Sequence, residues 1–190
     1  MSPAWGGSSR IYKFLATGDN NGIVYLKGID LREVLRSWES LIWLLPYRAA
    51  YGKDEVIVRT PFYNYTVYDN EKFLEDIKYE YGKEILARLA DYREIKDPKV
   101  TVYPLYAVGK DTPYKFDYDA RYRGVAEYFR KPDVNTIFDF EPEKSYEAGD
   151  GSVPKRTLDL GDKWEKTILL PGYQSETDDH NSILANPVYL

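Results

Sequence analysis

The feature that most constrains this chain is an aspartate between two glycines, followed further along by the only histidine of the protein. Asp150 lies in the sequence Gly-Asp-Gly, and His180 lies in the polar segment 178–182. Together they form two thirds of a catalytic triad in which a nucleophile precedes the acid and the acid precedes the histidine. In such a triad the aspartate fixes the imidazole tautomer, and the histidine is the general base. We therefore expect Asp150 and His180 to lie within hydrogen-bond reach.

Each half of this pattern has a simpler interpretation. Gly-Asp-Gly alone is most often a plain turn, and a lone histidine in a polar loop is most often solvated. A metal cluster of Asp178, Asp179 and His180 is a weaker alternative, because adjacent ligands seldom close a site. The nucleophile of a triad in this order is a serine in a Gly-x-Ser-x-Gly turn, and no serine of this chain lies in such a motif.

Composition excludes several classes of protein. A length of 190 residues with 43% hydrophobic residues predicts one folded domain. The net charge of -5 argues against nucleic acid as a partner. Cysteine is absent, so there is no disulfide, no thiol nucleophile and no cysteine-based zinc site. No apolar run is long enough to span a membrane, and residues 1–7 do not resemble a signal peptide.

Helical periodicity is clearest in residues 30–45. Asp30 is the expected cap, Pro46 ends the pattern, and Leu31, Leu35, Trp38 and Ile42 share one apolar face. We expect this face to pack on the body of the protein, with contact to lipid as the alternative. Shorter helices are predicted after Ser8 or Ser9 up to Gly18, from Asp69 or Asn70 to Ile77, from Lys83 to Tyr92, and up to Trp164.

Strand signals dominate the second half. Residues 100–108 are predicted to form a buried strand, with a bulge or an edge at Pro104. In residues 114–118 aromatic side chains alternate with Lys and Asp, which predicts one arm of a hairpin. Residues 119–148 are polar and are predicted to be irregular, and residues 167–170 are predicted to form a strand. Helices that alternate with strands predict an α/β sheet with its site at the strand ends.

One modification signal lies outside this site. Asn64-Tyr65-Thr66 is an N-glycosylation sequon, which matters only if the chain enters a secretory compartment. Asn64 lies in a turn-like, tyrosine-rich stretch, so we expect it to be accessible.

Eight motifs follow one another along the chain. They are PAWGGS (3–8), LATGDNNGI (15–23), residues 36–46, TPFYNYT (60–66), FLEDI (73–77), VYPLYAVGKDTP (102–113), GDGSV (149–153) and the histidine loop. Any one of these motifs is weak, but their common order is specific. In this order they resemble the lecithin:cholesterol acyltransferase family, which also includes lysosomal phospholipase A and phospholipid:diacylglycerol acyltransferase.

The resemblance implies a fold, a site and a reaction. The fold is the C-terminal half of an α/β-hydrolase, a mostly parallel sheet with flanking helices and a hairpin insertion. Residues 1–190 are then a single partial domain that lacks the N-terminal strands and the nucleophile elbow. Asp150 is implied as the catalytic acid and His180 as the base, with no cofactor and no metal. The family moves an acyl group from a phospholipid, through an acyl-serine, to an alcohol or to water.

Two interpretations remain open. In the first, the chain is the acid and histidine half of a lipid acyltransferase or phospholipase, is inactive alone, and works with an N-terminal half or another chain that supplies the serine. In the second, it is a non-catalytic truncated member that binds lipid or a partner chain. The resemblance implies a secreted, lysosomal or lumenal location, without a signal peptide in these residues.

Overall fold

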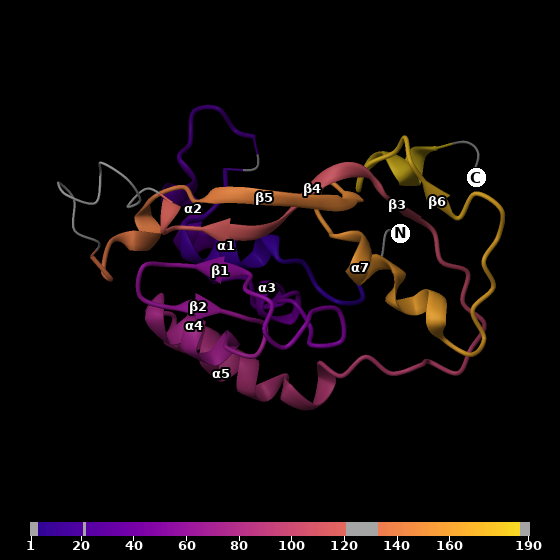
Figure 1. The fold of residues 1–190 in the computed structure, drawn as a ribbon, viewed down its shortest axis with the longest axis horizontal. Coiled ribbons are helices and arrows are strands. Elements are labelled where there is room, and N and C mark those ends of the chain that lie inside the picture. Colours follow the sequence, from indigo (N-terminus) through magenta and orange to yellow (C-terminus); the bar gives the residue numbers. More distant parts are fainter. Residues whose placement is uncertain (1–3, 21, 121–132, 187–190) are drawn as a thin grey trace.

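The computed structural model describes residues 4–20, 22–120 and 133–186, and it has helices packed around a mixed β-sheet (Figure 1). The α/β class expected from the sequence is therefore confirmed. The helices are α1 (Arg10–Ala16), α2 (Gly28–Arg36), α3 (Glu39–Trp43), α4 (Asn70–Asp76), α5 (Glu80–Arg88) and α7 (Lys155–Leu158), with 3₁₀ helices at Ala90–Tyr92, Ile137–Asp139, Asp159–Lys163 and Ser182–Ala185. The strands are β1 (Val58–Arg59), β2 (Asn64–Tyr65), β3 (Tyr106–Ala107), β4 (Gly109–Asp117), β5 (Glu143–Asp150) and β6 (Gln174–Ser175).

The larger sheet has the strand order β2-β1-β4-β5, with β1 and β4 parallel and the other pairs antiparallel. Its long arms are β4 and β5, so the hairpin arm predicted at 114–118 is confirmed. The prediction that 119–148 is irregular is wrong for β5, and residues 121–132 of that range lie outside the described residues. Most of β5 is exposed, which explains why its sequence is too polar to be recognised as a strand.

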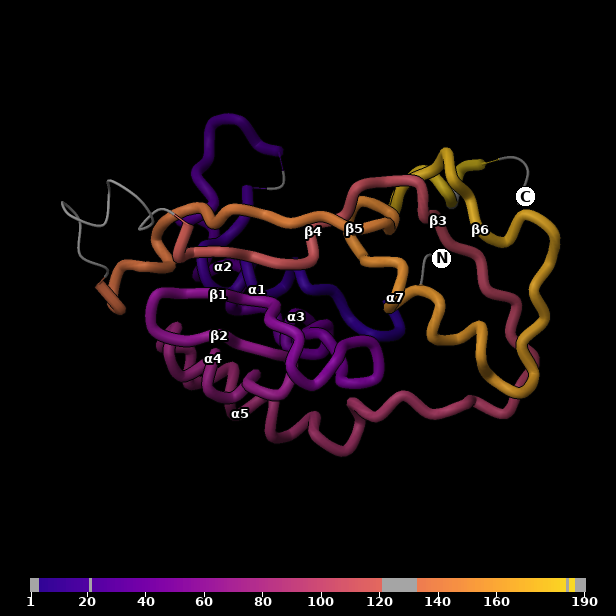
Figure 2. Tube along the Cα trace, in the orientation of Figure 1, coloured from indigo at the N-terminus to yellow at the C-terminus, as the bar shows by residue number. Residues whose placement is uncertain are grey.

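A second, two-stranded parallel sheet joins β3 to β6. The buried strand predicted over 100–108 is wrong except at β3, because Pro104 offers no N–H to a ladder and Val100 and Tyr103 are exposed. The strand predicted at 167–170 is also wrong: Thr167 makes only an isolated bridge to Val102. Figure 2 shows the two segments around this bridge running side by side along one end of the molecule.

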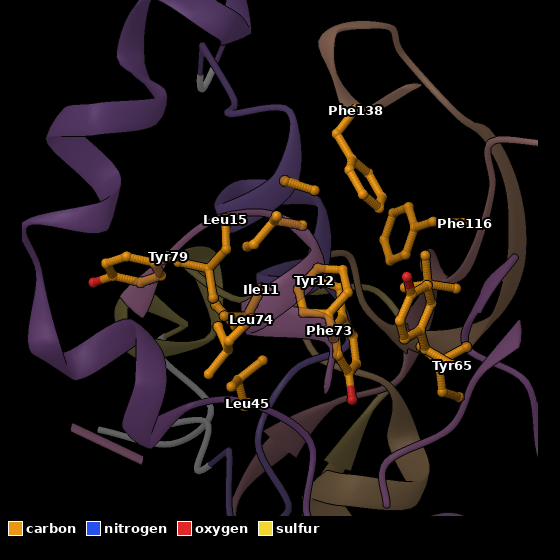
Figure 3. Packing of buried hydrophobic residues seen from close by; sticks show 14 of the residues in the cluster. Ile11, Tyr12, Leu15, Leu45, Tyr65, Phe73, Leu74, Tyr79, Phe116 and Phe138 are labelled. Atoms are coloured by element: carbon orange, nitrogen blue, oxygen red, sulfur yellow. The ribbon is translucent and has the colours of Figure 1, made fainter. Parts of the chain in front are cut away.

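The hydrophobic core lies where α1 and α4 meet the larger sheet. Tyr12 and Phe73 are fully buried, and their rings pack edge to face with centroids 4.9 Å apart. Phe138 packs on Phe73 in the same way, and Leu15 and Leu45 lie nearby in the cluster (Figure 3). Each such side chain contributes roughly 1.5–3 kcal/mol when fully buried. This cluster fixes the N-terminal helices and the larger sheet as one unit.

The helix predicted over 30–45 is two helices, α2 and α3, so that prediction is wrong in its length. Ser37 interrupts it, since its hydroxyl donates to the carbonyl of Val34 at 2.6 Å, and Trp38 adopts an extended backbone. Leu35 and Ile42 are buried as expected, whereas Trp38 is 50% exposed. Helix α2 starts earlier than predicted, with Lys27 at the capping position. The backbone N–H of Lys27 donates to the Asp30 carboxylate.

The other helices begin and end close to their predicted limits. Gly18 ends α1 with a φ of +83°, the left-handed conformation that favours glycine. Ser9 holds the capping position of α1, but its hydroxyl bonds elsewhere, to the carbonyl of Pro113. The described residues include no helix that is both long and apolar enough to cross a membrane.

Candidate acid–histidine site

Asp150 is the last residue of β5, and the glycines on either side make its turn possible. A Cβ on Gly149 would lie 2.4 Å from both the Thr112 hydroxyl and the Val153 carbonyl oxygen. Gly151 has a φ of +92°, which other residues rarely adopt. The Gly-Asp-Gly sequence therefore lets the chain reverse directly at the strand end, with the aspartate side chain fully buried.

The turn holds one oxygen of the Asp150 carboxylate. Oδ1 accepts hydrogen bonds from the backbone N–H groups of Ser152 at 2.9 Å and Val153 at 2.7 Å. These bonds favour the charged form of the carboxylate and fix its rotation. The other oxygen, Oδ2, is left to face the histidine loop.

His180 meets Asp150 through both its side chain and its backbone. Its Nδ1 lies 2.7 Å from Asp150 Oδ2, and its backbone N–H donates to the Asp150 carbonyl at 2.9 Å. The predicted hydrogen-bond reach is thus confirmed. A carboxylate at Nδ1 selects the tautomer with the proton on that nitrogen, so Nε2 carries the free lone pair. The imidazole is 36% exposed, and it remains accessible on one side.

The pair changes the acidity of the histidine. The hydrogen bond to Asp150 raises the pKa of His180 above its ordinary value, partial burial opposes this, and the charges of Asp150 and Asp179 add to the increase. A raised pKa makes the ring a stronger base once it is deprotonated. The arrangement can therefore accept a proton at Nε2 and stabilise the resulting imidazolium.

The two aspartates before His180 shape its loop. Asp178 accepts from the Ser175 hydroxyl and the Asn186 amide, both at 2.6 Å, and the Ser175 bond is the main cause of its lowered pKa. Asp179 accepts from the backbone N–H groups at 181 and 182. Among the described residues no three acidic, histidine or cysteine side chains are grouped to hold a metal ion.

Sequence reasoning missed two hydroxyl groups that support the acid turn. The fully buried Thr112 accepts from the Gly151 N–H at 2.8 Å and donates to the Lys110 carbonyl at 3.0 Å. Ser8 donates to the Ser152 carbonyl at 2.7 Å. Both residues lie in motifs quoted above, at 102–113 and 3–8, so a signal was present. The hydrogen-bond partners of these two hydroxyl groups are distant in the sequence, so the motifs alone could not identify them.

The other predicted site residues lie apart from this pair. Asn64 is exposed at the start of β2, as expected. In the described part of the chain, the His180 ring has one hydrogen bond, to Asp150, and no serine hydroxyl reaches it. The structure thus brings together the predicted acid and histidine and places no serine of the described residues beside them.

Comparison with known proteins identifies the relatives of this chain. The profile of "Lecithin:cholesterol acyltransferase" matches residues 1–93 and 78–185. The chain is 35% identical to mouse phosphatidylcholine-sterol acyltransferase over 192 residues, or 98% of this chain and 40% of that protein. It is 33% identical to bovine lysosomal phospholipase A and acyltransferase over 198 residues, or 100% of this chain and 44% of that protein. It thus spans less than half the length of these relatives, and it belongs to the lecithin:cholesterol acyltransferase family.

Proposed function

We propose that this chain is the C-terminal, acid and histidine part of an α/β-hydrolase that transfers an acyl group from a phospholipid to an alcohol or to water. The observation that carries the proposal is the 2.7 Å contact between His180 Nδ1 and the buried Asp150 carboxylate. In this proposal residues 1–190 form one partial domain, and Asp150 and His180 are its catalytic residues. The family membership supports lipid acyl chemistry in general.

The proposed reaction uses the pair in two steps. His180 Nε2 takes the proton of a serine hydroxyl as the serine oxygen attacks the ester carbonyl, and the resulting imidazolium gives that proton to the departing lysophospholipid oxygen. In the second step the same nitrogen takes a proton from water or an alcohol as its oxygen attacks the acyl-serine, and it returns that proton to the departing serine oxygen. Asp150 stays charged throughout and holds Nδ1–H in place.

The serine and the oxyanion donors would come from a segment outside these 190 residues. No Gly-x-Ser-x-Gly turn occurs in the sequence. An oxyanion donor is worth about 3 kcal/mol, and a nucleophile cannot be replaced by the base alone. The chain by itself is therefore expected to be inactive toward esters.

Substrates and location follow from the relatives by analogy. The names of the relatives specify phosphatidylcholine, a sterol and phospholipase A activity for those proteins. For this chain we propose a phospholipid donor and a lipid alcohol or water as acceptor, with no cofactor. A lumenal, lysosomal or secreted location would suit both these substrates and the sequon at Asn64.

The test is to supply the missing part. The chain is co-expressed with an N-terminal segment that carries the family's serine elbow, and the complex is assayed on phospholipid vesicles for released fatty acid. We expect ester cleavage by the complex and none by either part. His180→Ala should abolish it, and Asp54→Asn, an exposed carboxylate, is the matched control. Cleavage that survives His180→Ala would refute the proposal.

A non-catalytic, lipid-binding role is the second candidate. The observation that favours it is the loop 23–26, where Val24 is 86% exposed and Tyr25 is 96% exposed. Apolar side chains this exposed suit a surface that contacts lipid or a partner. If the complex binds vesicles without cleaving them, and if Tyr25→Ser weakens that binding, this second role replaces the first.

A further inference from the structure

A cavity of about 770 Å³ lies away from the histidine loop, beside α4 and α5. Figure 1 shows these helices on the opposite side of the molecule from β6 and the C-terminal segment. The cavity is bounded by the loop 46–49, the two helices and the segment 90–95. Its volume is within the range of pockets that hold small organic ligands, roughly 300–1,000 Å³.

Arg93 contributes a fixed cation to this cavity. Its Nη2 donates to the carbonyl oxygens of Leu45 at 2.6 Å and Pro46 at 3.1 Å, and its guanidinium lies 4.6 Å from the centre of the Tyr47 ring. Its Nε is buried and has no hydrogen-bond partner among the described residues. The carbonyls hold the group in place, but they do not neutralise its charge.

Arg48 adds a second cation to the same cavity. Its guanidinium lies 4.7 Å from the centre of the Tyr68 ring. In the described part of the chain, the contacts of Arg93 are with two backbone carbonyls and the Tyr47 ring, that of Arg48 is with the Tyr68 ring, and neither arginine is paired with a carboxylate. Burial is the main cause of the lowered pKa of Arg93; Tyr47 and Tyr12 oppose this lowering, and the charge of Arg48 adds a smaller one. Glu71 and Glu94 also line the cavity, but neither guanidinium group has a carboxylate as a direct salt-bridge partner.

The other charged side chains around the cavity are not paired with either arginine in the described part of the chain. Lys83 pairs with Glu80 at 3.3 Å, and Glu94 pairs with Lys96 at 3.2 Å. Glu71 is exposed at the edge. The remaining walls are largely apolar and are contributed by Val67, Leu86, Ala87 and Ile95.

We propose that this cavity binds a carboxylate that carries an apolar chain, such as the anion of a fatty acid. A planar carboxylate is the anion whose geometry a guanidinium matches best, and a bound one would compensate the charge of Arg93 and Arg48. The apolar walls would take up the chain of the ligand. The proposal does not depend on the proposed acyl transfer, because it concerns binding at a separate cavity.

The test is calorimetric titration of the 190-residue chain with decanoate, below the concentration at which decanoate forms micelles. We expect saturable binding that is about tenfold weaker in Arg93→Gln, the loss expected for one charge-assisted contact. Decanol has the same chain and no charge, and it should bind more weakly than decanoate. No saturable binding of decanoate, or equal binding of decanol, would overturn the proposal.

Two further variants separate binding from folding. Ala87 is an exposed position of α5 at the wall of the cavity, so Ala87→Trp should fold normally and block the ligand. Arg88→Gln removes a neighbouring arginine that pairs with Glu39 instead, and it should bind decanoate as the parent chain does. Unchanged binding in Ala87→Trp would overturn the location. Decyl phosphate that binds more tightly than decanoate would overturn the choice of a carboxylate.

Discussion

Replacing Asp150 by asparagine tests the acid–histidine pair with one change of charge. The amide has the shape of the carboxylate, so Oδ1 can still accept from the N–H groups of Ser152 and Val153. The group that faces His180 Nδ1, however, becomes neutral. The hydrogen bond to Asp150 is the largest cause of the raised pKa of His180, so the variant should lower this pKa.

The effect on stability can be worked from the same contacts. A hydrogen bond to a charged group contributes about 1.5–3 kcal/mol and one between neutral groups about 0.5–1.5 kcal/mol, so the two backbone bonds lose about 2 kcal/mol together. The lower cost of burying an amide offsets part of this, leaving about 1 kcal/mol. The interaction of Asp150 with His180 adds a contribution to the free energy of unfolding that depends on pH. Because the folded pKa of His180 is raised, this stabilisation is complete below the unfolded pKa of about 6.5 and is lost as the pH rises through the folded pKa.

Two measurements check this prediction. His180 is the only histidine, so one ring signal in a proton–carbon correlation spectrum reports its titration without assignment. Urea unfolding at pH 6 and at pH 9 should show a larger loss of stability for Asp150→Asn at pH 6. Asp179→Asn is the graded control, since Asp179 is the last of the causes given for the raised pKa. A His180 pKa that is unchanged or higher in Asp150→Asn would refute the pairing.

Three further predictions concern other parts of the chain. Expression in a secretory pathway should add a glycan at the exposed Asn64, and a secreted chain whose mass does not change on glycosidase treatment would contradict this. Gly18→Ala should lower the free energy of unfolding by about 3 kcal/mol, because its Cβ would lie 1.9 Å from a carbonyl oxygen; Gly22→Ala, with a similar φ and open space around it, should cost about 1 kcal/mol. Thr112→Val should cost about 1–3 kcal/mol in urea unfolding, since the Gly151 N–H loses its acceptor, and Thr112→Ser should restore most of it.

The sequence was sufficient for the acid turn and the histidine because local chemistry specifies them. Glycines on both sides of Asp150 permit the backbone conformations that a tight turn needs, and a single histidine leaves one candidate for the base. The hairpin arm at β4 was also predictable, because alternation is a local signal. The contact between Asp150 and His180, by contrast, depends on how the loop after β6 returns to the end of β5.

The errors have two physical origins, a local hydrogen bond in one case and the pairing of strands in the others. The pattern at 30–45 has helical periodicity throughout, but Ser37 can bond its own turn, and the chain breaks there. At 100–108 the residues have strand propensity, but no neighbouring strand lies beside most of them. Strand formation depends on a partner, and β5 forms despite a polar sequence because β4 pairs with it along its length. Local preference could not reveal either partner.

The contacts of the pair bear on how a triad could be completed by another segment. Among the described residues, the turn amides hold the Asp150 carboxylate, and the hydroxyls of Thr112 and Ser8 hold the turn itself. The His180 ring is therefore oriented by Asp150 without any contact to a serine of the described residues. An oriented base needs little reorganisation on assembly, and much of a catalytic advantage comes from such fixed geometry. Ser8 lies nearest the start of the chain among these residues, and it joins the N-terminal segment to the acid turn. Under the proposed function, a serine-bearing segment that packs on residues 4–8 would be coupled through Ser8 to the turn that holds Asp150.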